Sequence, residues 1–197
     1  MGAILQSLGR TVAAGVVLLV VMVALVATLG AGSAQYDHAW GAFVMRYLHV
    51  LSGVMWIGLL WYFNFVQIPS MPKIPDEQKP AIGKVIAPAA LFWFRWAALS
   101  SVVIGLLLAT MNGYIAAALS LQRPDTAIGI GMWLALVMAY NVWFIIWPNQ
   151  KKALGIVTVT PEEKTKAARL AMLTSRVNTM LSIPMLFCMV AQQNGGL

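Results

Sequence analysis

The chain has 197 residues, of which 60% are hydrophobic and only 10% charged, and its mean hydropathy is +0.80. Soluble domains usually carry about 25% charged residues, so the composition excludes a soluble protein and indicates an integral membrane protein. The net charge of +7 lies mostly in two loops and does not indicate nucleic-acid binding. A membrane span needs roughly 20 apolar residues. Five segments meet this length, at 11–31, 41–66, 87–118, 128–147 and 170–191.

The first apolar segment resembles a signal peptide, because Arg10 precedes it and small residues follow at 31–34. Its apolar run over 11–29 is too long for the core of a typical signal peptide, so we expect it to be retained as a membrane anchor. The sequence therefore predicts an N-terminal transmembrane helix and outer loop over 1–40. A four-helix membrane domain is expected over 41–197, which gives an all-α bundle of about five transmembrane helices.

The loops between these segments predict an orientation. All seven lysines lie in loops 67–86 and 148–169, whereas loop 119–127 carries only Arg123, offset by Asp125. Basic loops face the cytoplasm in membrane proteins. The N-terminus is therefore predicted to be cytoplasmic and the C-terminus to lie on the opposite, periplasmic side.

Several residues mark helix ends, breaks and close contacts. Thr160, Pro161 and Glu163 are typical of a helix start with a capping box. The prolines of loop 67–86 predict an extended connection, because proline cannot continue a helix. Pro184 is expected to kink the last segment. Small residues permit close helix contacts, and we expect such contacts at Gly105, Gly113 and Gly129.

The second apolar segment carries an unusual polar face. Arg46, His49, Gly53 and Trp56 share one side of a helix, and ionisable residues inside a membrane helix suggest a functional site. Neutral imidazole is a common metal ligand, so His49 could hold the iron of a haem b. Gly53 would leave room for the porphyrin, and Arg46 could pair with a propionate. The alternative is a histidine hydrogen-bonded between helices, with Arg46 reaching toward the interface.

A second axial ligand is not evident from the sequence. His38 lies eleven residues before His49, roughly 16 Å away along a helix, which is too far to share one iron. A surface histidine is the favoured interpretation, and a ligand of a second site is the alternative. Methionine also ligates haem iron, and four methionines lie in the apolar segments, although methionines in a membrane bundle are more often packing residues. They are Met111, Met138, Met185 and Met189.

A second polar group appears once the predicted helices are oriented. Amides, hydroxyls and two arginines from four helices fall at a similar depth near the cytoplasmic side. Arginine and asparagine suit a planar, anionic ligand, so these residues predict a substrate site. Each residue alone is more often structural, because arginines reach toward interfaces and asparagines hold helices together. The candidate substrate-binding residues are Asn64, Arg95, Asn141, Arg176 and Asn178, with Gln67, Ser175 and Thr179 nearby.

Four strings carry a resemblance to a known family. They run over 49–67 (His49-Val-Leu-Ser-Gly-Val-Met-Trp), 92–96 (Phe-Trp-Phe-Arg-Trp), 141–152 (Asn-Val-Trp-Phe-Ile-Ile-Trp-Pro) and 175–187 (Ser-Arg-Val-Asn-Thr-Met). Together they resemble the membrane domain of bacterial membrane-bound, cytochrome c-linked urate oxidases over about 41–191. The second segment is also loosely similar to membrane haem proteins of protoporphyrinogen oxidation, in which such a histidine ligates haem b.

The resemblance implies a protein of the bacterial inner membrane that oxidises urate and passes electrons to a periplasmic cytochrome c. It implies that Arg95, Asn141, Arg176 and Asn178 bind urate, and that His49 with haem b carries electrons outward. A cytochrome c module needs a Cys-x-x-Cys-His motif, whereas these 197 residues contain one cysteine, Cys188. A separate cytochrome c is therefore expected as the electron acceptor.

A second function stays open from the sequence. The chain could be a non-catalytic accessory subunit of a larger respiratory or photosynthetic membrane complex, which keeps the bundle without the chemistry. The missing cytochrome module favours this interpretation, whereas a redox protein is favoured by the presence of Arg46, His49, Arg95 and Arg176. A transporter is less favoured, because the predicted spans carry no carboxylate for ion coupling and show no repeat.

Overall fold

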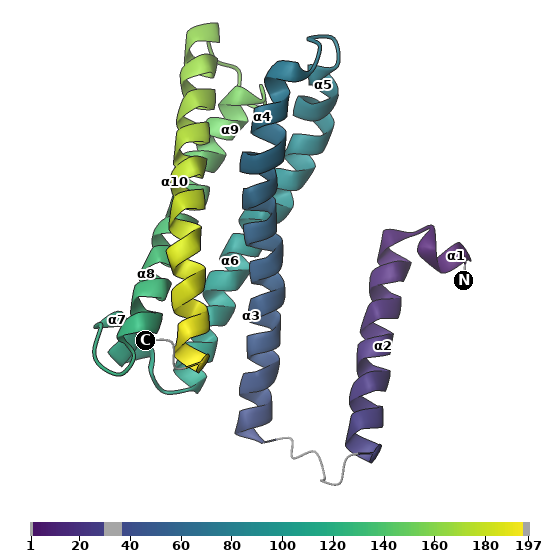
Figure 1. Cartoon of the computed structure of the whole chain (residues 1–197). Coiled ribbons are helices and arrows are strands. Elements are labelled where there is room, and N and C mark those ends of the chain that lie inside the picture. The colour runs from purple at the N-terminus through teal and green to yellow at the C-terminus, as the bar shows by residue number, and fades with distance from the viewer. Residues whose placement is uncertain (1, 30–36, 195–197) are drawn as a thin grey trace. The chain divides into compact units, whose positions relative to one another are not determined.

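The computed structural model describes residues 2–29 and 37–194, and long helices dominate this part of the chain (Figure 1). The chain divides into two compact units, Met1–Gly41 and Ala42–Leu197. In the first unit, α1 (Gly2–Leu5) precedes the long helix α2 (Leu8–Leu29). No residue of α2 is buried, and an 18-residue window within it has a mean hydropathy of 2.9. A helix that is apolar on every side is suited to lipid.

The second unit is a bundle of long helices. α3 (His38–Trp61), α6 (Ala87–Met111), α8 (Thr126–Tyr140) and α10 (Pro161–Asn194) lie side by side in Figure 1. With short helical extensions, these four stretches and α2 are the five helices, among the residues that the structure describes, that are long and apolar enough to cross a membrane. The predicted all-α class and the five long apolar helices are therefore confirmed.

Apolar side chains from these helices form the main core of the bundle. Leu60 of α3 and Phe94 of α6 pack with Met138 of α8, and all three have at most 1% of their surface exposed. Val142 and Ile146 continue this core along the chain. The buried layer therefore lies between the four helices, while many of their other apolar side chains face outward.

Within the described residues, three π-helical turns interrupt the long helices, and each ends two residues before a proline. Proline lacks an N–H group, and its ring clashes with the carbonyl of the fourth residue before it. In each case that carbonyl belongs to the π turn. Because a π turn is wider than an α turn, the carbonyl is moved away from the proline ring. The π turns are η1 (Tyr62–Gln67), η3 (Ile82–Ile86) and η4 (Asn141–Ile146), and the prolines are Pro69, Pro88 and Pro148.

The prediction of an extended loop over 67–86 is wrong. The helix continues through α4 (Ile68–Ser70) and η2 (Met71–Lys73), and it restarts at α5 (Lys79–Ala81), so only 74–78 is non-helical. Each short segment has a proline at its first or second position. At Pro80 in α5, where the helix restarts, the missing N–H group costs nothing, because the first turn of a helix has no acceptor for it.

The predicted third span, 87–118, ends too late. α6 stops at Met111, and Gly113 has a φ of 77°, a left-handed conformation that favours glycine. After this turn, α7 (Ile115–Leu119) packs against α8. Gly113 therefore makes the turn and not the close helix contact expected of it. Gly129 does make such a contact, because a Cβ there would meet the carbonyl of Ala118.

The helical stretch continues from η4 into α9 (Trp147–Ala153), and α10 then begins at the predicted place with the predicted capping box. The backbone N–H of Glu163 donates to Thr160 Oγ1 at 3.2 Å, and the N–H of Thr160 donates to Glu163 Oε2 at 3.4 Å. α10 runs on through Pro184 to Asn194.

We expect Thr160→Ala to lower the free energy of unfolding by about 1 kcal/mol, because it removes the side-chain acceptor at the first turn. Chemical unfolding in detergent micelles measures this difference. Thr158→Ala is the matched control, since Thr158 is exposed and precedes the helix. Equal stability of the two variants would contradict the role of the capping box.

Candidate functional site

A cleft with a volume of about 580 Å³ lies between α3, α6, α8 and α10. We call it the histidine cleft. All four residues of the predicted polar face of α3 line it, together with Ser101 and Gly105 of α6. Ligand sites of this volume are common in proteins, and bundle interiors are one of their usual places. The four residues of that predicted face are Arg46, His49, Gly53 and Trp56, and other residues of α3 line the cleft beside them.

His49 is held by α6 in one orientation. Its Nδ1 lies 2.9 Å from the backbone carbonyl oxygen of Ser101. A carbonyl only accepts hydrogen bonds, so Nδ1 carries the proton and Nε2 keeps a lone pair. The ring rests on Gly105, where an added Cβ would come within 2.8 Å of Cε1 and 3.0 Å of Nδ1. Metal-binding histidines usually donate their second ring nitrogen to a carbonyl or carboxylate in this way.

Three buried polar atoms of the histidine cleft have no hydrogen-bond partner among the residues that the structure describes. They are Arg46 Nε, Trp56 Nε1 and Ser101 Oγ. Buried polar groups are nearly always paired, so unpaired ones call for an explanation such as a bound molecule. All three can donate a hydrogen bond, and Arg46 also carries a positive charge. The cleft is therefore suited to a ligand with acceptor oxygens.

Tyr114 also lines this cleft. Burial raises the pKa of its hydroxyl above the usual value, and this effect exceeds the opposing influence of the positive charge of Arg46. The phenol therefore stays neutral near pH 7. Arg46 is the one charged side chain among the residues that line the cleft, so a ligand bound here meets a net positive environment.

Two further features fit a large planar ligand with a metal. A Cβ built on Gly53 or Gly58 meets nothing within 4 Å, so both glycines leave open space along the cleft. Three methionines, Met132, Met185 and Met189, line the same cleft, and a thioether is a known partner of histidine on haem iron. No cluster of three metal-binding His, Cys, Asp or Glu side chains occurs within 2–29 and 37–194.

The other sequence candidates for a second ligand lie elsewhere. Met138 is fully buried in the core, and Met111 is not among the residues that line the cleft. His38 is the first residue of α3 and is exposed. Sequence reasoning missed Ser101, Gly105, Tyr114 and Met132. Of these four residues, only Gly105 was indicated by the sequence, because a small residue was expected there at a helix contact.

The predicted substrate residues form pairs with other parts of the bundle. Asn64 Nδ2 donates to Ser175 Oγ at 2.8 Å. Asn141 Nδ2 donates to Asn178 Oδ1 at 2.8 Å, and Asn178 Nδ2 donates to the carbonyl of Met138 at 2.9 Å. Asn178 is completely buried and Asn141 is 9% exposed. These amides therefore join η1 and the segment around η4 to α10.

The two arginines of that set lie apart from these pairs. The guanidinium of Arg95 stacks over the ring of Trp147, 3.8 Å from its centroid, and also faces Phe92. Such cation–π contacts are a common structural role for arginine. Arg176 is exposed on the outer side of α10. None of Arg95, Asn141, Arg176 and Asn178 lines the histidine cleft.

Over residues 2–29 and 37–194 the fold is thus all-helical, with five helices long and apolar enough to cross a membrane. Residues 123–195 match the protein family described as urate oxidase N-terminal, so this part of the chain is similar to that family. No curated protein and no solved structure gave a significant match. The matched stretch contains α8 and α10 with Asn141 and Asn178, and it does not include His49.

Proposed function

We propose that this chain is a membrane haem b protein that transfers electrons. We further propose that it forms the membrane part of a urate-type oxidase that passes electrons to a separate cytochrome c. The observation that carries the first part is the hydrogen bond from Nδ1 of His49 to the carbonyl of Ser101, within a cleft of about 580 Å³. The match of residues 123–195 to the urate oxidase N-terminal family supports the second part.

The residues of the histidine cleft fit a haem. His49 would ligate the iron through Nε2, because Nδ1 is committed to Ser101. Arg46 would pair its unsatisfied Nε with a propionate, and the open space at Gly53 would accept the porphyrin. Bound haem supplies a one-electron redox couple whose potential depends on its ligands and on burial. The carbonyl of Ser101 fixes the ring of His49 and strengthens its basicity.

An optical spectrum of the purified protein tests this function, recorded oxidised and then reduced with dithionite. We expect reduced b-type haem bands in the unmodified protein and their loss in His49→Ala. Gly53→Leu should also lose them, because its side chain would fill the space beside His49. The matched control is Gly15→Leu, which also meets open space but lies in α2.

Full haem bands in both His49→Ala and Gly53→Leu would contradict the assignment. If the protein contains haem, a second spectrum is recorded under anaerobic conditions with urate in place of dithionite as the reductant. Reduction of the haem by urate supports the urate-type reaction, and no reduction would reject urate as the electron donor while leaving the haem site in place.

A further inference from the structure

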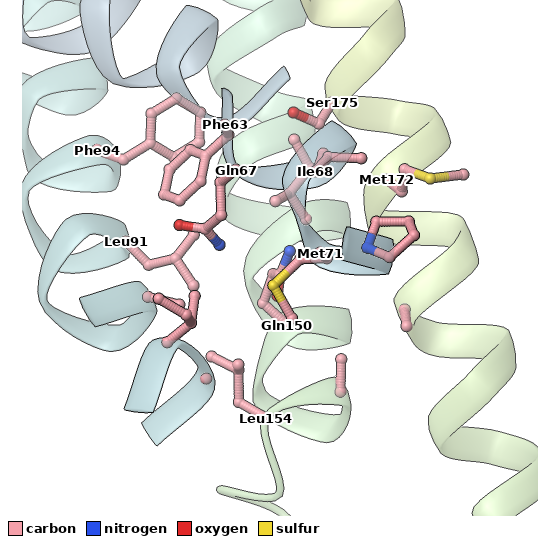
Figure 2. Close-up of a pocket in the computed structure, with 17 residues that line it drawn as sticks. Phe63, Gln67, Ile68, Met71, Leu91, Phe94, Gln150, Leu154, Met172 and Ser175 are labelled. Carbon is pink, nitrogen blue, oxygen red and sulfur yellow. The ribbon is translucent and has the colours of Figure 1, made fainter. Parts of the chain in front are cut away.

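A second cavity, with a volume of about 360 Å³, lies at the end of the bundle where η2 and α9 meet α10 (Figure 2). We call it the glutamine cavity. Two aromatic rings, Phe63 and Phe94, form part of its wall, with their centroids 5.7 Å apart. Figure 2 shows the carboxamides of Gln67 and Gln150 among apolar side chains. The cavity is large enough for a small ligand.

The lining of the glutamine cavity is uncharged. None of its 17 lining residues is Asp, Glu, Lys, Arg or His, and its polar side chains are Gln67, Gln150 and Ser175. A charged ligand here would lose its hydration without gaining a counter-charge. Oε1 of Gln67 is buried and has no partner among the described residues. The cavity therefore suits a neutral, mostly apolar ligand that donates a hydrogen bond.

All three π turns contribute to the wall of this cavity. Phe63 and Gln67 belong to η1, Ile82 and Gly83 to η3, and Ile146 to η4. Single π turns in helices occur frequently at functional sites. The prolines explain how each turn forms, but they do not explain why three turns from separate segments line one cavity. That convergence supports a binding role for the cavity.

We propose that the glutamine cavity binds a lipophilic quinol. A quinol is an uncharged flat ring with hydroxyl donors and an apolar tail, which matches an aromatic wall, an unpaired amide acceptor and an apolar lining. One ring hydroxyl donates to Oε1 of Gln67, and the ring lies against Phe63 and Phe94. This inference concerns a different cavity from the haem proposal and does not depend on it.

Equilibrium binding of a benzoquinol with a decyl tail, under nitrogen in detergent micelles, tests this site. Gly83→Leu should abolish binding, since a Cβ at Gly83 meets nothing within 4 Å and the added side chain would occupy the cavity. Gln67→Leu should weaken binding about tenfold through loss of one hydrogen bond. Gly15→Leu in α2 is the matched control and should bind like the unmodified protein.

His49→Ala separates this inference from the proposed function. It should bind the quinol with unchanged affinity even when it has lost the haem bands. Unchanged binding by both Gly83→Leu and Gln67→Leu, in protein with unaltered thermal unfolding, would overturn the site. Displacement of the quinol by phospholipid at equal concentration would also overturn it, because the cavity would then be a general lipid site.

Discussion

Gly105→Ala is expected to destabilise the bundle and to prevent binding of the proposed haem, whereas Gly53→Ala should do neither. Each change adds one methyl group to the lining of the histidine cleft. At Gly105 the new Cβ would lie 2.8 Å from Cε1 of His49, closer than such contacts allow. The imidazole would have to move, which breaks its 2.9 Å hydrogen bond to Ser101. At Gly53 the same atom meets open space.

The two variants should differ in the sign of their effect on stability. Alanine favours a helix over glycine by about 1 kcal/mol, so Gly53→Ala should be neutral or slightly more stable. Crowding a packed contact costs about 1–3 kcal/mol, so Gly105→Ala should be less stable by up to roughly 2 kcal/mol after that gain is subtracted. Unfolding in detergent and haem content measure the two effects. Equal stability and equal haem in both variants would show that His49 does not rest on Gly105.

The sequence identified one wall of the histidine cleft because that wall lies on a single helix. Helical spacing alone brings Arg46, His49, Gly53 and Trp56 to one face, and all four line the cleft. The partner of His49 could not be identified in this way. Ser101 lies 52 residues away, and its backbone carbonyl leaves no mark in the sequence.

The second predicted site was inferred from the depth of its residues along the helices, and depth does not determine which side of a helix a residue faces. Ser175, Arg176 and Asn178 share a depth in α10, yet Ser175 and Asn178 are buried while Arg176 is exposed. Adjacent helix positions differ by about 100° in direction. The spacing of Ser175, Asn178 and Ser182 does follow one face, so the buried polar stripe could have been found from the sequence. Arg176 falls outside that stripe.

The π turns show a different limit. Prolines inside apolar segments predict helix ends, and on that basis 67–86 was expected to be extended. The chain instead widens the preceding turn and remains helical past Pro69 and Pro88. Packing of the whole bundle decides between these outcomes, because a continuous helix keeps its backbone hydrogen-bonded inside an apolar environment.

Asn141→Ala and Asn178→Ala are each expected to lower the free energy of unfolding by roughly 1–3 kcal/mol, because each leaves a buried amide without its partner. The double variant should cost less than the sum of the two, by about 1 kcal/mol, since the shared bond is lost only once. Asn149→Ala is the matched control. The amide of Asn149 donates to a carbonyl of its own helical turn, so its loss should have little effect.

Comparison of these single and double variants also distinguishes a structural role from a substrate-binding role for the two asparagines. The 2.8 Å bond between them and the full burial of Asn178 favour the structural role. If they bound a substrate, the single variants would weaken substrate binding while unfolding stayed unchanged. Additive losses of stability would contradict the pairing. A loss in the double variant that is smaller than the sum of the single losses would instead show that Asn141 and Asn178 hold η4 and α10 together. The substrate site would then be sought in the histidine cleft and the glutamine cavity.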